Sequence, residues 1–429
     1  LAARGSLATL VLAVLGALLS PDRIIRALSR FDEADSPHFT PADLAPSEEL
    51  LEIRKLNVAA ELIAPFVVVI SPQDAKQPAT GEWLANWLTE HQEAFRKVFF
   101  RHGAVIFRGF NVPSPVAFET VALAVNKELA KTYLGTSPRS SINGTTYVHT
   151  AADFGQHRTL PTHIEMSFRD HPPALQVFYA RKVEHTAGGE TPLTDFQGVW
   201  DTIRAQEHLR HKFEGKHVRY IRNYDDSRSV SSVDPTMQKA WQEMFKTDAH
   251  DIVLEKCSAE SFDCSFNEEN RLSIQNTQPW VRTHPVSGAQ IWFNHINVLV
   301  KDSMVYDYER TAALWGGLRG MWPMAIGLYY RVLFAGLSYM WPEAKFGSSS
   351  FFSEQGIPIT GDDFYQVKRA VWKNTVQNPY QLHDIVFVDN FRVGHGREMY
   401  AGPQTSRQIL TAWSDNYPPS WSASAPNSA

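Results

Sequence analysis

The sequence predicts an α+β protein built around a double-stranded β-helix, or jelly roll, with flanking helices. Helical apolar patterns alternate with buried strands in the first third of the chain, and short strands with turn signals follow. In addition, two residues of metal-ligand type, His163 and Glu165, stand two positions apart in one short strand-like stretch. Short strands around a pair of metal ligands are typical of a jelly-roll relative, because distant strands meet at its open mouth.

Composition favours an enzyme that acts on a small molecule. Of the 429 residues 43% are hydrophobic, enough for a large core, and the net charge of -5 offers no basic surface for nucleic acid. The only two cysteines, Cys257 and Cys264, exclude a disulfide framework and a Cys-based zinc finger. They could pair in an exported protein, but two free thiols are the more common case. Nothing in the sequence indicates the oligomeric state.

The chain is expected to have four parts. Residues 1–21 form a hydrophobic N-terminal segment, in which the uncharged run from Leu7 to Leu19 resembles the apolar part of a secretory signal. A targeting signal and a helix docked on the body both stay open, so the protein is either cytoplasmic or associated with the secretory pathway or a membrane. Residues 22–49 are expected to be a linker, residues 50–416 the main domain and residues 417–429 a disordered tail.

Within the main domain, apolar patterns predict helices over 81–100 and 115–129. They predict strands over 66–70, 103–110, 175–180, 218–221, 290–293 and 385–389. An apolar segment near 312–341 is interrupted by Arg319, Pro323 and Arg331, which argue against a membrane crossing. We expect a lid or a packed helical hairpin inserted between strands. A membrane-surface role is possible in principle but is not favoured.

Three residues are candidate metal ligands. Side chains alternate along a strand, so His163 and Glu165 are expected to point the same way. They would supply two ligands of a 2-His-1-carboxylate triad, which leaves Fe(II) three open positions. The candidate third ligand is His395, between two glycines and 232 positions later. Taken alone, His163 and Glu165 could equally be polar residues on a surface strand, because such pairs occur often by chance.

Two further residues suit a dicarboxylate. Arg407, in a strand-like run twelve residues after His395, is a fixed cation able to form a bidentate pair with a carboxylate. Thr191 follows the turn at Gly188 and Gly189, and its hydroxyl could bond the same carboxylate. The alternatives are a surface ion pair for Arg407 and a simple strand-forming role for Thr191.

Seven ordered blocks carry a family resemblance that spans about Leu50 to Trp413. Together they resemble the TauD/TfdA family of Fe(II)/2-oxoglutarate-dependent dioxygenases, in the branch with syringomycin-biosynthesis-like and clavaminate-synthase-like enzymes. The blocks are Gly103–Phe110, Ser137–Arg139, His163–Phe168, Gly188–Thr191, Trp292–Asn294, Asp389–Asn390 and His395–Arg397.

The resemblance implies a role for each candidate. His163, Glu165 and His395 would bind Fe(II), and Thr191 and Arg407 would bind the cosubstrate 2-oxoglutarate. With O2, the enzyme would hydroxylate an aliphatic C–H bond of a small molecule, such as an amino acid or a natural-product intermediate. Succinate and CO2 would be the co-products.

Some features leave alternatives open. Halogenating relatives have a small residue where this chain has Glu165, so the resemblance implies hydroxylation rather than halogenation. Thr411 stands where many family members have a second arginine, so the cosubstrate anchor could rest on Arg407 alone. A catalytically retired or membrane-tethered member that only binds a ligand is the main alternative. A hydrolytic zinc enzyme is a weaker one.

Overall fold

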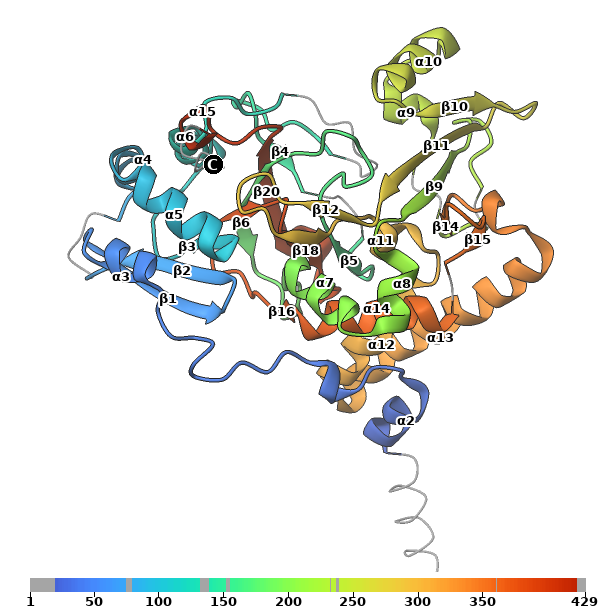
Figure 1. Cartoon of the computed structure of the whole chain (residues 1–429), viewed down its shortest axis with the longest axis horizontal. Helices are drawn as coiled ribbons and strands as arrows, with labels where there is room; N and C mark the ends of the chain where they lie inside the picture. Colours follow the sequence, from blue (N-terminus) through green and yellow to red (C-terminus); the bar gives the residue numbers. More distant parts are fainter. Residues whose placement is uncertain are drawn as a thin grey trace, which may run out of the picture.

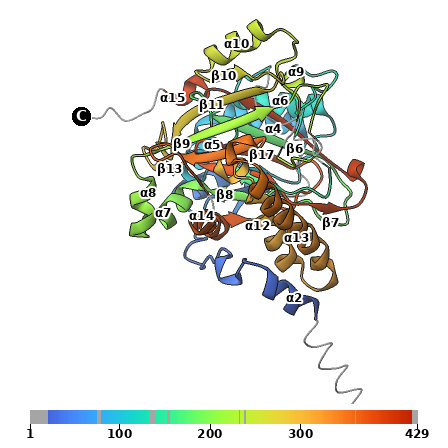
Figure 2. The same cartoon turned by 90° about the vertical axis from the view of Figure 1, so that its right-hand side faces the viewer.

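The structure is a computed structural model that describes residues 20–74, 79–131, 139–151, 155–231, 233–236, 239–359 and 361–422. The predicted N-terminal segment therefore lies outside the described residues except for its last two positions, and so do residues 423–429 of the predicted tail. Figures 1 and 2 show a body of mixed sheets and helices, as predicted.

Two sheets form the centre of this body. The larger has seven strands in the order β1 (Val58–Ala64), β2 (Val67–Pro72), β3 (Ala104–Phe107), β17 (Ile385–Asp389), β6 (Leu175–Val183), β20 (Arg407–Ser414) and β4 (His149–Thr150). The smaller has four strands in the order β16 (Thr375–Val376), β8 (Leu193–Asp195), β18 (Val393–Arg397) and β5 (Leu160–His163). Neighbours in both sheets pair antiparallel, except β2 with β3.

The two sheets share one apolar layer. Ile106, Phe178 and Val388 of the larger sheet belong to the same buried cluster as Leu193 and Val393 of the smaller sheet. Two sheets that bury a common layer must face each other, which is compatible with the predicted jelly roll.

Helices cover the outer faces of these sheets. Over the larger sheet lie α3 (Glu48–Arg54), α4 (Gly81–Glu90), α5 (Gln92–His102), α6 (Pro115–Val125) and α15 (Pro419–Ser422). Beside the smaller sheet lie α7 (Phe196–Arg204), α8 (Glu207–Phe213), α11 (Ile296–Leu299) and α14 (Gly361–Lys373). Short 3-10 turns are η1 (Glu33–Asp35), η2 (Glu343–Lys345) and η3 (Gln404–Ser406).

A third sheet extends to one side of the body (Figure 1). Its strands run in the order β10 (Asp263–Phe266), β11 (Leu272–Pro279), β9 (His217–Tyr224), β14 (Ser348–Phe352) and β15 (Ile357–Pro358), with α9 (Trp241–Phe245) and α10 (His250–Ala259) beside it. The two-stranded pairs are β12 (Val281–Thr283) with β13 (Gln290–Trp292), and β7 (Ala187–Gly188) with β19 (Tyr400–Ala401).

The two cysteines are joined rather than free. Cys257 near the end of α10 and Cys264 in β10 form a disulfide. A tight turn between the helix and the strand brings them together, because Phe262 N–H donates to the Cys257 carbonyl at 2.9 Å. The expectation of two free thiols is therefore wrong.

Most of the predicted helices and strands are found near their predicted positions, but one predicted helix is divided into two. The helix predicted over 81–100 is two helices, α4 and α5, because the backbone leaves helical geometry at His91 (φ -109°, ψ 29°). α5 ends at Gly103, whose φ is +101° and whose Cβ would lie 2.7 Å from the Val393 side chain. Only glycine combines that conformation with so close an approach.

The apolar segment near 312–341 contains the last turn of α12 (Ser303–Trp315) and the whole of α13 (Gly317–Met340), so it supplies one arm of a helical hairpin whose other arm begins before the predicted segment. α12 is largely buried, and α13 packs along it with Pro323 inside the helix. Lys368 of α14 anchors α12, since its Nζ lies 2.8 Å from both carboxylate oxygens of Asp307 in a fully buried position. Within the described residues, none of the helices combines the length and apolarity that crossing a bilayer requires.

The predicted linker is partly ordered. α2 (Pro21–Leu28) lies against the hairpin, where buried Ile25 packs with Ala312 and Met324. Farther along, buried Asp35 accepts from Arg369 Nε at 3.0 Å and 2.9 Å. An apolar contact and an ion pair thus hold a segment whose composition resembles a linker.

The first residues of the predicted tail are also ordered. Trp421 in α15 is buried against Phe95, Phe99 and Phe100, and Tyr417 Oη donates to Asp389 Oδ1 at 2.6 Å. Two aromatic side chains therefore bind the start of a Pro- and Ser-rich segment to the core.

Candidate metal centre

Two histidines far apart in sequence are direct partners across the smaller sheet. His163 ends β5, His395 lies in the middle of β18, and the two residues face each other in antiparallel register. The glycines beside His395 make this close pairing possible. A Cβ at Gly394 would lie 2.8 Å from the His163 carbonyl, and one at Gly396 would lie 2.6 Å from the Leu160 carbonyl.

Glu165 reaches the same place by a different route from the predicted one. β5 ends at His163, so Glu165 lies in a turn rather than on the same strand. The turn is held by Asn390: the Glu165 N–H donates to Asn390 Oδ1 at 2.8 Å, and the Asn390 amide donates to the Glu165 carbonyl at 3.0 Å. The same amide donates to the Pro173 carbonyl at 2.7 Å. The prediction that the His163 and Glu165 side chains point the same way is correct. The cause is this turn and not the alternation of side chains along a strand.

The three side chains fit one metal ion. Glu165 Oε2 lies 3.5 Å from His395 Nε2 and 3.9 Å from His163 Nε2, and all three side chains are buried. Ligand atoms each about 2.1 Å from a metal are at most ~4.2 Å apart, so both distances are compatible with one ion. Within the described part of the chain, no other group of three His, Cys, Asp or Glu side chains could hold a metal in this way.

The protonation states also suit a metal. His163 Nδ1 donates to the Pro161 carbonyl at 2.9 Å, which leaves the lone pair on Nε2. Burial lowers the pKa of His395 to about 4, so its ring is neutral. Burial alone would raise the pKa of Glu165, but Arg139 and the two histidines hold that pKa well below its usual range. Two imidazole nitrogens and a carboxylate are the donors that a facial-triad Fe(II) site requires.

Arg139 is a site residue to which the sequence assigns no role. Its Nη2 donates to Glu165 Oε2 at 2.7 Å, and its guanidinium lies 5.6 Å from the ring centroid of Trp413. Both charged side chains are 4% exposed, so the pair is shielded from solvent. The Ser137–Arg139 block is a sequence signal for this position, but without the fold nothing connects it to Glu165.

The predicted cosubstrate residues also come together. Arg407 Nη2 donates to Thr191 Oγ1 at 3.1 Å, and its Nε donates to the Gly189 carbonyl at 2.8 Å. Gly188 and Gly189 have φ of +70° and +74°, so the tight turn before Thr191 is present. Burial lowers the pKa of Arg407 from its usual value. A buried guanidinium beside a hydroxyl is a suitable partner for a carboxylate.

One cavity connects these residues with the histidines. It is lined by Arg139, Ala151, Leu160, His163, Phe178, Thr191, His395, Gly396, Arg397, Arg407 and Ile409. The Phe178 and His395 ring centroids are 4.6 Å apart, so an aromatic face shields one side of that histidine. All five predicted site residues thus lie in or directly beside one enclosed space.

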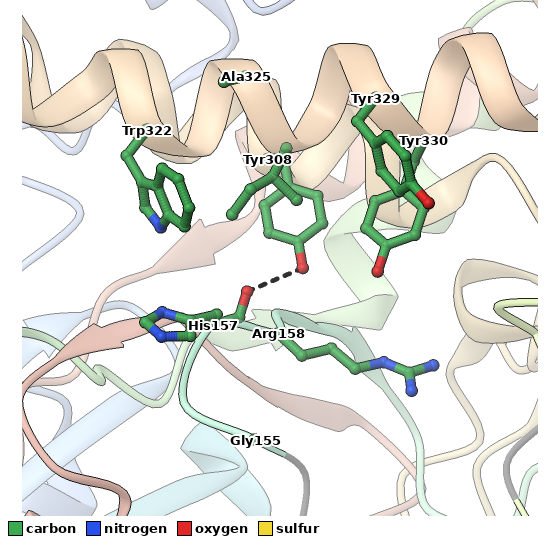
Figure 3. Close-up of a pocket in the computed structure, with 9 residues that line it drawn as sticks. Gly155, His157, Arg158, Tyr308, Trp322, Ala325, Tyr329 and Tyr330 are labelled. Atoms are coloured by element: carbon green, nitrogen blue, oxygen red, sulfur yellow. Dashed lines mark hydrogen bonds between the residues drawn. The ribbon is translucent and has the colours of Figure 1, made fainter.

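A larger cavity of ≈ 570 Å³ is lined by the loop from Gly155 to Arg158 and by residues of α12 and α13. Figure 3 shows Trp322, Tyr329 and Tyr330 extending from α13 toward this loop. Tyr308 of α12 donates from its hydroxyl to the His157 carbonyl at 2.9 Å. The walls are therefore mainly aromatic.

Arg397 connects the lining of the metal-side cavity with the loop that lines the outer cavity. Arg397 lines the metal-side cavity, and its Nη2 donates to the carbonyls of Gly155 at 2.9 Å and Arg158 at 2.7 Å. Arg397 therefore holds the loop in place through its backbone.

Replacing Asn390 by alanine should disturb the metal centre without removing a ligand. The change leaves three buried backbone groups without their partner, which should cost about 3 kcal/mol of unfolding free energy. It should also weaken iron binding by about 10- to 100-fold, because the Glu165 turn is no longer held. Denaturant unfolding and iron titration check both effects. A folded variant with wild-type iron affinity would show that Asn390 does not position Glu165.

Comparisons with known proteins place the chain in a family. The family model described as taurine catabolism dioxygenase TauD, TfdA family matches residues 70–330, more than half of the chain. Dapdiamide synthesis protein DdaC from Enterobacter agglomerans is 24% identical over 315 residues, covering 73% of this chain and 83% of that protein. A clavaminate synthase-like protein from Arabidopsis thaliana is 23% identical over 354 residues, covering 81% and 93%.

Among solved structures, the PvcB protein from Pseudomonas aeruginosa is 13% identical, with a TM-score of 0.45 and coverage of 83% of this chain and 91% of that one. The residues that the family model matches include β5 and the turn that carries Glu165. The chain therefore belongs to the TauD/TfdA family, and it is a non-haem dioxygenase that uses Fe(II), 2-oxoglutarate and O2.

Proposed function

We propose that this dioxygenase hydroxylates an aliphatic C–H bond of a small molecule and releases succinate and CO2. The observation that carries the proposal is the convergence of His163, His395 and Glu165 in one buried place, with Arg407 and Thr191 lining the adjoining cavity. A retired member would be free to lose any of these five groups. Their convergence therefore favours a working oxygenase over a protein that only binds a ligand.

The proposal gives each metal-side residue a task. His163 and His395 hold the metal through Nε2, and Glu165 holds it through its carboxylate. Bound there, Fe(II) together with 2-oxoglutarate and O2 supplies the oxidising power needed for an unreactive C–H bond. Arg139 keeps Glu165 ionised and oriented, and Phe178 keeps water from one face of His395.

Arg407 and Thr191 hold the cosubstrate in this proposal. The far carboxylate of 2-oxoglutarate pairs with the Arg407 guanidinium and accepts from the Thr191 hydroxyl, which directs the keto-acid end toward the histidines. Thr411 cannot share this task, because it is buried, donates to the Val177 carbonyl at 2.9 Å and accepts from Gln176 at 2.6 Å. The anchor thus rests on Arg407.

Glu165 favours hydroxylation over halogenation. Its carboxylate occupies the position that must be small if a halide is to bind beside the metal. Its buried pair with Arg139 further fixes that carboxylate in place. We also propose that the seven- and four-stranded sheets are the two halves of a double-stranded β-helix, which accounts for the meeting of β5 and β18.

The substrate is proposed to approach through the outer cavity. Its volume of ≈ 570 Å³ lies within the range of about 300–1,000 Å³ that is typical of small-molecule sites. Its aromatic walls suit the apolar part of an amino-acid derivative or a natural-product intermediate. A relative named for dapdiamide synthesis supports a substrate of that kind.

Substrate-triggered oxygen uptake under ¹⁸O2 tests the proposed reaction. A panel of amino acids and natural-product intermediates is supplied with Fe(II) and 2-oxoglutarate, and products are analysed by mass. Hydroxylation predicts a substrate that gains one ¹⁸O atom and one succinate formed per product. A product that has lost two hydrogens without gaining oxygen would instead assign desaturation. Loss of oxygen uptake in the Tyr330→Ala variant would support entry through the outer cavity.

A further inference from the structure

The hairpin leaves an apolar helix face uncovered in the described structure. Every third or fourth residue of α13 on this face is exposed, and the set comprises Leu318, Trp322, Ala325, Tyr329, Val332 and Tyr339. These spacings place the six side chains on one stripe of a 3.6-residue helix. Leu318 is 83% exposed, Val332 66% and Tyr339 94%, values far above those of a packed helix.

The charged residues of α13 itself have one sign. α13 contains Arg319 and Arg331 and no acidic residue, and neither arginine falls on the stripe. Arg331 is paired with Glu309, whereas Arg319 is exposed. The neighbouring α2 exposes Arg23 and Arg26. A locally basic border on a chain of net charge -5 is the arrangement that anionic lipid headgroups attract.

The N-terminal apolar run precedes α2 in the sequence, and α2 packs against α13. The run from Leu7 to Leu19 is followed directly by Ser20, which caps α2. α2 is fixed to the hairpin, since Asp22 Oδ1 accepts from the Gly317 N–H at 2.7 Å at the first residue of α13. Figures 1 and 2 both show α2 and α13 at the same end of the molecule. α2, which directly follows the apolar run in sequence, is therefore fixed to the first residue of α13.

We propose that the exposed face of α13 rests on the surface of a phospholipid bilayer that contains anionic headgroups. The apolar stripe enters the boundary between headgroups and acyl chains, with tryptophan and tyrosine at the depth that such rings prefer. The basic residues of α2 and α13 contact the headgroups. The outer cavity then opens beside the membrane surface, because Trp322 and Tyr329 belong both to the stripe and to the cavity wall (Figure 3). This inference does not depend on the oxygenase reaction.

Vesicle flotation with the full chain tests the proposal. The probe vesicles contain either phosphatidylcholine alone or phosphatidylcholine with one quarter phosphatidylserine. The wild-type protein should float with the anionic vesicles. The triple variant Leu318→Glu, Val332→Glu, Tyr339→Glu should lose about tenfold or more of its partition coefficient, because three apolar contacts become charges. None of these three residues lines a cavity described above.

A matched control variant distinguishes loss of the stripe from a general effect of added negative charge on vesicle binding. Val233→Glu, Ile252→Glu, Leu254→Glu makes the same change in net charge at side chains 52%, 40% and 42% exposed. Ile252 and Leu254 lie in α10, at the opposite end of the molecule from α2 (Figures 1 and 2). This control should keep wild-type vesicle binding. Equal losses in both triple variants would overturn the proposal.

The N-terminal run must be tested separately, because it could bind vesicles without α13. The variant Leu10→Glu, Leu12→Glu, Leu15→Glu should keep measurable binding that disappears when the stripe variant is added. If this variant alone abolishes binding while the stripe variant binds like the wild type, the run is the anchor and the proposal is wrong. Light scattering tests whether the exposed face of α13 instead forms a dimer. A dimer that the stripe variant dissociates, without vesicle binding, would assign the face to a second copy of the chain.

Discussion

Replacing either His163 or His395 by alanine should abolish turnover and weaken iron binding by more than about 100-fold. In the proposed site each histidine supplies one of three protein ligands, and removal of even an indirect partner of a ligand commonly costs about 10- to 100-fold in metal affinity. Because the two rings are cross-strand partners with centroids 4.7 Å apart, the two variants should have closely similar effects. Iron content after dialysis and succinate formation measure the loss.

The control for this experiment is a histidine outside the site. His211, whose side chain is 65% exposed on α8, can be replaced by alanine with no expected change in iron content. Circular dichroism and thermal unfolding show whether the buried variants remain folded. A folded His395→Ala protein that keeps stoichiometric iron would remove His395 from the ligand set.

Replacing Arg407 by alanine should raise the 2-oxoglutarate concentration needed for half-maximal turnover by about 100-fold or more. Loss of one partner of a buried charge pair commonly costs about 2–5 kcal/mol, and each 1.4 kcal/mol is a factor of about ten. Iron affinity without cosubstrate should be unchanged, because Arg407 contacts Thr191 and Gly189 rather than the ligands. The dependence of succinate formation on 2-oxoglutarate measures the effect.

Two further variants sharpen the Arg407 experiment. Arg407→Lys should recover only part of the affinity, because an ammonium cannot reproduce the planar two-point contact. Arg181→Ala removes an exposed arginine from the neighbouring strand β6 and should leave the 2-oxoglutarate dependence unchanged. A wild-type dependence in Arg407→Ala would exclude this residue as the cosubstrate anchor.

The ligand types could be predicted from the sequence, but their spatial arrangement could not. His163, Glu165 and His395 follow from residue chemistry and from the ordered blocks. The turn that presents Glu165 could not be foreseen, because it depends on Asn390, which is 225 positions away in sequence. Side-chain alternation along a strand predicted the direction of Glu165 correctly but for the wrong reason. Hydrogen bonds to Asn390, and not strand geometry, orient this residue.

In the segments that flank the main domain, long-range contacts could not be predicted either. Pro- and Ser-rich composition predicts a linker and a disordered tail, yet Ile25, Asp35 and Trp421 are buried. Each of these residues packs against or pairs with residues far away in sequence. The average composition of the segment does not indicate such a contact. The helix α13 could be predicted, because a run of about 30 mostly apolar residues is a strong local signal, whereas most of its partner α12 lies outside that run.

Anaerobic titration of the wild-type protein with Fe(II) and 2-oxoglutarate tests the central claim most directly. The account predicts a weak visible charge-transfer band that requires both components and reaches its maximum near one of each per chain. The band should be absent in His163→Ala, and in Arg407→Ala it should require much more 2-oxoglutarate. A folded, iron-loaded wild-type protein that shows no such band at saturating 2-oxoglutarate would contradict the assignment of this site.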